Sequence, residues 1–269
     1  HAQGGKVTLE QFYGTMTTQY ALGVDVFTSY FSKQLLDAPA YARYNHAVGR
    51  IDRIMGGGKH AAEVAVYYPI ETIQADTIPH GSEQIYSWMH KNPLATACWN
   101  SVRDSMNVLL DRQIDFDFLD AEALEKARMG NGQFTVPGGE SFRVLVVPYC
   151  LDTPRLTSIL ERLRAHGVTI LRLGDTESPA RLPEEIDAVV TPAIRLNNTP
   201  QILSLCRDHD DGRSILLVNT TPEEVHAPAQ IPFSDTATLY DPLTEERNTI
   251  SAQDFSVTLP PYGAKILIL

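Results

Sequence analysis

The stretch IMGGGKHAAEVAVYYPIET, residues 54–72, distinguishes a nucleotide-binding fold from a joint between two structural units. A Walker A loop or a dinucleotide fingerprint places its glycines after a strand and before a helix. Here the glycines at 56–58 follow a helical pattern and precede the apolar strand pattern EVAVYYPI, and His60 stands where Walker A needs Ser or Thr. We therefore interpret the glycines as a helix end and a flexible joint, and we predict no phosphate site there.

Two helices are predicted on the N-terminal side of this joint. In the first, Thr8 and Gln11 form a capping box, and apolar residues then recur at helical spacing. The apolar segment VDVFTSYF, residues 24–31, follows as a predicted strand, and a second helix covers residues 40–55. Because a parallel strand needs cover on both faces, this lone helix–strand unit predicts further strands upstream of the given sequence.

From Glu63 onward, strand and helix patterns alternate. This alternation predicts an α/β fold with a doubly wound, mostly parallel sheet and helices on both of its faces. A small hairpin is predicted at 132–142, with its turn at Pro137-Gly138-Gly139. The predicted strands cover residues 63–70, 114–119, 142–148, 168–173 and 186–192, and the predicted helices cover 82–90, 94–113, 120–128 and 153–167.

After about Asp211 the pattern changes to short strands separated by Pro, Asn, Asp and Gly. Such a pattern is typical of an antiparallel β module of the sandwich or barrel kind. We therefore expect three parts, which are a helical segment at 1–58, an α/β domain at 59–210 and an antiparallel β domain at 211–269.

Composition and charge exclude several classes of partner. The chain of 269 residues carries 22 basic and 33 acidic residues, which gives a net charge of −11 and disfavours binding to nucleic acid or to anionic lipid. No apolar run is long enough to span a bilayer, and the first residues show no signal-peptide pattern, so the compartment stays open. Three scattered cysteines predict neither a disulfide framework nor a metal site, and no cofactor motif is present.

Two acidic residues are the candidate catalytic groups. Glu71 and Asp76 follow the strand pattern at 63–70, where the carboxyl edge of a parallel sheet is expected. Paired carboxylates are the groups that glycoside hydrolysis needs. The alternative is that both are solvated loop charges.

Two further positions are candidates for other roles. His46 and Arg50 belong to a basic face of the second helix, which is either a solvated face or one that faces a ligand. Cys150 follows the strand pattern RVLVVPY and is a candidate nucleophile only if a histidine lies close enough to act as its base. Otherwise it is a small buried apolar residue.

The ordered set of motifs resembles a family of large bacterial glycoside hydrolases of the α-L-rhamnosidase-like type. TLEQFYGTMTTQYALGVDVFTSYFS looks like the last helix and strand of a (β/α)8 barrel, and YARYNHAVGRIDRIMGGGKHAAEVAVYYPIET looks like the helix, joint and strand that leave it. DFDFLDAEAL and FRVLVVP resemble the flavodoxin-like, amidotransferase-like accessory domain, for which the trimerisation domain of family 42 β-galactosidases is a distant analogue. SILLVNTTPEEV, ATLYDPLTEE and LPPYGAKILIL are similar to the terminal β domain.

This resemblance implies a glycoside hydrolase, or the C-terminal part of one, acting on plant or bacterial polysaccharide without a cofactor. It implies a carbohydrate substrate, and it places Tyr30 and Ser32 at the rim of the sugar site. The family's catalytic carboxylates lie on earlier barrel strands, to which nothing in this chain corresponds. The alternative function is a non-catalytic module that binds carbohydrate or forms a homo-oligomer.

Overall fold

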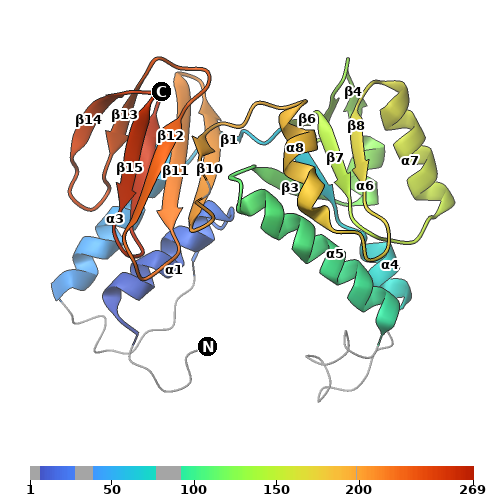
Figure 1. The fold of residues 1–269 in the computed structure, drawn as a ribbon, viewed down its shortest axis with the longest axis horizontal. Coiled ribbons are helices and arrows are strands. Elements are labelled where there is room, and N and C mark those ends of the chain that lie inside the picture. The colour runs from blue at the N-terminus through green and yellow to red at the C-terminus, as the bar shows by residue number, and fades with distance from the viewer. Residues whose placement is uncertain (1–6, 28–38, 77–91, 198) are drawn as a thin grey trace. The chain divides into compact units, whose positions relative to one another are not determined.

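The computed structural model describes residues 7–27, 39–76, 92–197 and 199–269. The chain divides into two compact units (Figure 1). Unit 1 comprises residues 1–61, 111–113 and 192–269, and unit 2 comprises residues 62–110 and 114–191.

Unit 1 contains two antiparallel sheets that share one apolar core. Ile215 and Leu217 point into this core, together with Val257 of the second sheet. The larger sheet has the order β1 (Lys59–His60), β10 (Ile202–His209), β11 (Gly212–Asn219), β16 (Ala264–Ile268), β13 (Thr236–Tyr240) and β14 (Arg247–Ser251). The smaller sheet has the order β15 (Phe255–Leu259), β12 (Val225–Gln230) and β9 (Arg195–Leu196).

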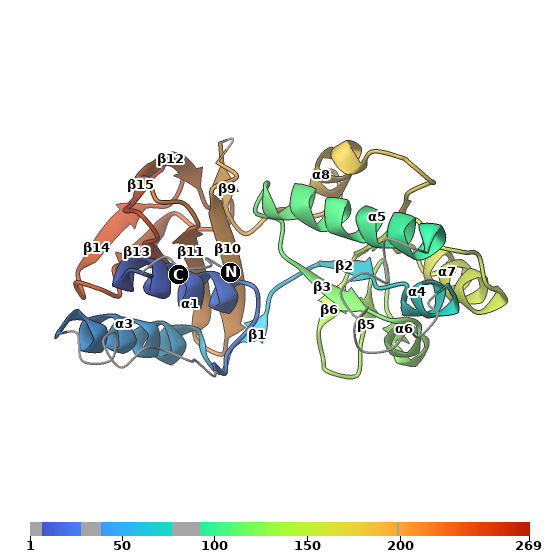
Figure 2. The ribbon, with the colours of Figure 1, turned by 90° about the horizontal axis from the view of Figure 1, so that it is seen from below.

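Two helices pack on the other face of the larger sheet. α1 (Leu9–Ala21) and α3 (Pro39–Met55) contact β11, whose residues Leu216 and Val218 are fully buried and alternate with the residues of the shared core (Figure 2). The predicted capping box is confirmed, because Thr8 Oγ1 accepts a hydrogen bond from the Gln11 amide and Gln11 Oε1 accepts one from the Thr8 amide.

The predicted strand at 24–31 is wrong for the part that the structure describes. Residues 24–27 form no strand, and the side chains of Val24 and Val26 are 41% and 81% exposed. An apolar pattern shows only that a segment suits burial. Within the described residues, no strand pairs with residues 24–27. Residues 28–31 lie outside the described residues.

Unit 2 contains the predicted parallel sheet, in the order β3 (Phe116–Leu119), β2 (Val64–Tyr67), β7 (Val144–Val147) and β8 (Thr169–Arg172). Successive residues of β2 and β7 belong to two separate buried clusters, one on each face of the sheet. The first cluster includes α6 (Ala121–Lys126) and α7 (Pro154–Ala165), and the second includes the end of α5 (Pro93–Leu110) and α8 (Leu182–Asp187). The remaining elements are α4 (Ile70–Ala75), the 3-10 turn η3 (Pro179–Arg181), and a small antiparallel sheet of β4 (Arg128–Met129), β5 (Phe134–Thr135) and β6 (Ser141–Phe142).

Two further expectations differ from the structure. The predicted strand at 186–192 is wrong, because Leu182, Ile186 and Val190 recur at intervals of four residues and enter one buried cluster as α8 and the turn after it. The expected boundary at 210/211 falls inside the pair of strands β10 and β11. The division into 1–58, 59–210 and 211–269 therefore differs from the two compact units, and as a statement about separately folding domains it stays a prediction. The predicted helix at 82–90 lies outside the described residues.

Candidate functional site

The carboxyl edge of the parallel sheet in unit 2 is the candidate site. From β2 the chain continues to β3 on one side, and from β7 it continues to β8 on the other, so the connections diverge between β2 and β7. Open α/β sheets bind ligands outside the carboxyl ends of their strands at such a point. Glu71 follows β2 and Cys150 follows β7, as the sequence predicts for this edge.

Side chains of the protein itself fill part of this edge. The Tyr149 amide donates to Ser101 Oγ of α5 at 2.8 Å, and the Leu151 amide donates to Thr72 Oγ1 of α4 at 3.2 Å. Backbone amides after a strand are the groups that bind phosphate in many α/β proteins. In this loop two of these amides are already bonded, so the edge is poorly suited to a nucleotide.

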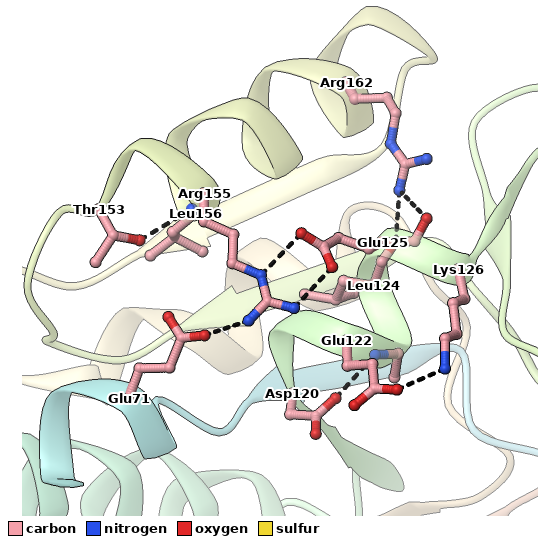
Figure 3. A network of polar contacts seen from close by, with 11 residues as sticks. Glu71, Asp120, Glu122, Leu124, Glu125, Lys126, Thr153, Arg155, Leu156 and Arg162 are labelled. Atoms are coloured by element: carbon pink, nitrogen blue, oxygen red, sulfur yellow. Dashed lines mark hydrogen bonds and ion pairs between the residues drawn. The ribbon is translucent and has the colours of Figure 1, made fainter.

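Glu71 belongs to an ion-pair network that joins three helices (Figure 3). Arg155, in the first turn of α7, contacts the Glu71 carboxylate of α4 through Nη1. The same guanidinium donates from Nε to Glu125 Oε1 at 2.8 Å and from Nη2 to Glu125 Oε2 at 2.7 Å. α7 begins here because Thr153 Oγ1 accepts a hydrogen bond from the Leu156 amide at 3.1 Å, which fixes the direction of the first turn.

The network shifts the pKa of Glu125 and of Arg155. Hydrogen bonds from Arg155 are the largest cause that lowers the pKa of Glu125 below its usual value. Hydrogen bonds to Glu125 and Glu71 raise the pKa of Arg155 in turn. Both shifts favour the charged forms of Glu125 and Arg155, and Arg155 is shared between two carboxylates.

Asp76 has a different partner from Glu71. Its Oδ2 accepts a hydrogen bond from the Ala95 amide at 3.1 Å, in the first turn of α5. A carboxylate at this place satisfies one of the free amides of the helix. The two predicted catalytic carboxylates therefore hold separate structural contacts, and their catalytic role stays a prediction.

The predicted sugar-binding residues lie in unit 1 where the structure describes them. Arg50 of α3 donates from Nη1 to the Pro242 carbonyl at 3.0 Å, and its Nη2 lies 2.5 Å from Glu245 Oε1. With its side chain only 23% exposed, Arg50 joins α3 to the turn between β13 and β14. His46 is exposed on the same helix. Tyr30 and Ser32 lie outside the described residues.

Cys150 lacks the properties of an activated nucleophile. Burial raises its pKa to about 11, although Arg172 opposes this shift. The thiol is 5% exposed and belongs to the apolar cluster of unit 2. A reactive thiolate needs a lowered pKa and access to solvent, so the reading of Cys150 as a small buried residue fits better.

Arg155 and Glu125 are the residues of this edge that the sequence analysis missed. Arg155 stands directly after the Thr-Pro start of a helix that follows a buried strand, so its position at the carboxyl edge was available from the sequence. Glu125 is 30 residues earlier in the chain, and no local pattern indicates that the two meet. No group of three or more His, Cys, Asp or Glu residues in the described part of the chain is arranged to hold a metal ion.

Comparison with protein-family models and with curated proteins finds no match. Solved structures do match at low sequence identity. A rhamnosidase from Novosphingobium sp. PP1Y has a TM-score of 0.69 at 14% identity, covering 98% of this chain and 30% of that protein. Gan42B, a GH42 β-galactosidase from G. stearothermophilus, has a TM-score of 0.65 at 11% identity, covering 100% and 52%. An exo-carrageenase of GH42 from Bacteroides ovatus has a TM-score of 0.62 at 13% identity, covering 97% and 39%.

These comparisons show the fold. The chain resembles parts of glycoside hydrolases, and it spans between 30% and 52% of the length of these three structures. It combines a parallel sheet with several antiparallel sheets, as the α/β prediction expects in general terms. No helix in the described ranges is both long and apolar enough to cross a membrane.

Proposed function

We propose that this chain is part of a bacterial glycoside hydrolase that cleaves glycosidic bonds of plant or bacterial polysaccharide. The observation that carries the proposal is the structural likeness to a rhamnosidase, a β-galactosidase and an exo-carrageenase, each of which covers at least 97% of the chain. A match of that extent includes residues of both units. Three enzymes with different sugars in their names thus share this arrangement of elements with the chain.

The proposal includes a flavodoxin-like assignment for unit 2. Numbered along the chain, its parallel strands are arranged 2-1-3-4, which is the flavodoxin-like order up to its fourth strand. The switch point of that order lies between β2 and β7, where the side chains of Thr72 and Ser101 occupy the loop after β7. This supports an accessory role for unit 2 in place of nucleotide binding.

The chemistry of glycoside hydrolysis sets the role of the chain within the enzyme. Two carboxylates must flank the glycosidic oxygen, about 5–10 Å apart depending on the stereochemical outcome. Glu71 is engaged by Arg155, and Asp76 is engaged by the start of α5. We therefore place the reacting carboxylates in a part of the same enzyme other than this edge. We assign a supporting, non-catalytic role to this chain.

A panel of aryl glycosides tests this assignment. The purified chain is expected to release no aryl alcohol, whereas the product of the full reading frame, extended upstream of His1, is expected to do so. The matched variants are Glu71→Gln and Asp76→Asn, with Glu122→Gln, an exposed carboxylate paired with Lys126 on α6, as the control.

Each result has a defined meaning. The chain alone could hydrolyse a glycoside, and this activity could be lost in Glu71→Gln but kept in Glu122→Gln. That result would show that the predicted catalytic residues act as such, and it would overturn the supporting role. A reading frame that does not continue upstream, together with no turnover on any glycoside, would overturn the proposed enzyme. A stable oligomer that then bound glycans without cleaving them would establish the non-catalytic module instead.

A further inference from the structure

We infer that the groove between α6 and α7 is a binding site for a neutral sugar ring, an inference that rests on the proposed function for its ligand class. The groove has a volume of about 340 Å³ and is lined by Glu125, Arg155, Ser158, Ile159 and Arg162. Sites for small molecules begin at about 300 Å³, so the groove has room for one sugar unit or a short part of a chain. Both walls belong to unit 2.

The polar side chains of the groove are held in place before any ligand binds. Arg155 is fixed by its two hydrogen bonds to Glu125 and by its contact with Glu71 (Figure 3). Arg162, two turns further along α7, donates from Nη2 to the Leu124 carbonyl at 2.5 Å and to the Glu125 carbonyl at 3.1 Å. A ligand that meets side chains already fixed in this way does not bear the cost of ordering them.

Hydrogen-bonding capacity remains after these internal contacts. A guanidinium has five N–H donors, and Nε and Nη1 of Arg162 make no hydrogen bond within the described ranges. The lining carboxylate, Glu125, accepts one hydrogen bond from Arg155 at each oxygen and so keeps further lone pairs that can accept. Ser158 adds an exposed hydroxyl to the groove. Fixed donors and acceptors side by side match hydroxyl groups, each of which donates and accepts at the same atom.

The charges around the groove select against an anionic ligand. The lining contributes two positive charges, from Arg155 and Arg162, and one negative charge, from Glu125. Glu71 does not line the groove but pairs with Arg155 and adds a second negative charge to the cluster. The cluster is therefore neutral as a whole and lies on a protein whose net charge is −11. A carboxylate or a sulfate gains little Coulomb energy there, whereas the hydroxyls of a neutral sugar bring no charge that must lose its water.

Titration of the full chain with neutral methyl glycosides, methyl α-L-rhamnoside and methyl β-D-galactoside, tests the site. The readout is the amide spectrum recorded by nuclear magnetic resonance, in which residues of α6 and α7 are expected to shift. Sodium glucuronate serves as the charged probe and is expected to bind no more tightly than the neutral sugars.

The decisive variant fills the groove without touching the ion pairs. Ser158 is exposed and lines the groove, so Ser158→Tyr is expected to fold normally and to weaken sugar binding at least tenfold. Thr157→Tyr places the same side chain on the preceding residue of α7, which is also exposed but does not line the groove, and this variant is expected to bind sugar as the unaltered chain does. Arg162→Lys keeps the charge but loses the planar fork and is expected to weaken binding as well.

Three results would overturn the inference. These are shifts absent from α6 and α7 with both glycosides, equal affinity in Ser158→Tyr and Thr157→Tyr, and tighter binding of glucuronate than of the neutral sugars. The measurement reports binding alone, so its failure leaves the glycoside turnover of the longer enzyme untouched. Conversely, a chain whose longer form cleaves no glycoside can still show these shifts.

Discussion

Arg155 donates two hydrogen bonds to the Glu125 carboxylate, from Nε to Oε1 at 2.8 Å and from Nη2 to Oε2 at 2.7 Å. The two residues come from α7 and α6, and the contact of Arg155 with Glu71 adds α4. One guanidinium thus connects three helices that follow three different strands of the parallel sheet. The planar guanidinium of arginine can bond two carboxylates in fixed directions, whereas the compact ammonium group of lysine cannot pair with a carboxylate through two parallel N–H donors.

Glu125→Gln is expected to lower the free energy of unfolding of unit 2 by a small amount at pH 7. The pKa of Glu125 is lowered in the folded state, so its contribution is present above the ordinary value near 4.5 and is lost as the pH falls through the lowered folded value. The difference in the free energy of unfolding between Glu125→Gln and the unaltered chain should therefore be smaller at pH 3 than at pH 7. Urea unfolding followed by tryptophan fluorescence measures this difference in the free energy of unfolding, because Trp99 lies on α5 in unit 2.

Glu161→Gln is the control for this measurement. Glu161 is exposed on the same helix as Arg155 and makes no ion pair in the part of the chain that the structure describes. If Glu161→Gln lowered the free energy of unfolding as much as Glu125→Gln does, the Arg155–Glu125 pair would make no specific contribution to stability. High salt should reduce the effect, because both side chains are open to solvent.

Gly58→Ala is expected to destabilise unit 1 by about 1–3 kcal/mol through overpacking. A Cβ at this position would lie 2.5 Å from His209 Cε1 and 3.0 Å from Arg207 Cβ. Gly49→Ala is the matched control, since Gly49 lies in α3 with nothing within 4 Å of the added Cβ. There the better helix propensity of alanine should stabilise the unit by about 0.5–1 kcal/mol. Thermal unfolding by circular dichroism should show melting shifts of opposite sign, and equal shifts would contradict the packing argument.

Asn219→Leu is expected to cost about 2–4 kcal/mol, because it leaves several buried polar groups without partners. The Asn219 side chain is fully buried, and its Nδ2 donates to the carbonyls of Glu223 at 2.6 Å and Pro260 at 2.9 Å. Its Oδ1 accepts from the Thr221 amide at 2.9 Å. Chemical denaturation measures the loss, and Asn248→Leu, on the exposed strand β14, should stay within about 0.5 kcal/mol of the unaltered chain.

The thiol of Cys150 is expected to react slowly with Ellman's reagent in the folded protein. With a pKa of about 11, about one thiol in a thousand is ionised at pH 8, and the thiolate is the reactive form. The other two cysteines are buried as well, so the folded chain should show no fast phase. In urea all three should react at once. A fast phase in the folded protein that vanished in Cys150→Ser would restore the nucleophile reading.

Features set by neighbouring residues could be predicted from the sequence. The pattern Thr-x-x-Gln at residues 8–11 gave the start of α1, since both hydrogen bonds of a capping box close within one turn. The apolar runs of β2 and β7 gave the parallel sheet, because strands buried on both faces have no polar alternation.

Features set by partners distant in the chain could not be predicted. The apolar run at 202–206 was not assigned as a strand, although β10 pairs with β11 across the whole length of both. The apolar residues at 186 and 190 were read at strand spacing, whereas the buried cluster that they enter selects a helix and a turn. Likewise, the meeting of Arg155 with Glu71 depends on the order of strands in the sheet, and a single sequence carries no local trace of that order.

The place of β16 in the larger sheet has a consequence for biosynthesis. This strand follows β13 and β14 in the sequence, yet it lies between β11 and β13, in the interior of the sheet. The ribosome must therefore release residues 264–268 before the two halves of that sheet can join. Every strand of the parallel sheet lies before residue 191, so this sheet can form during synthesis before β16 is available to pair with β11.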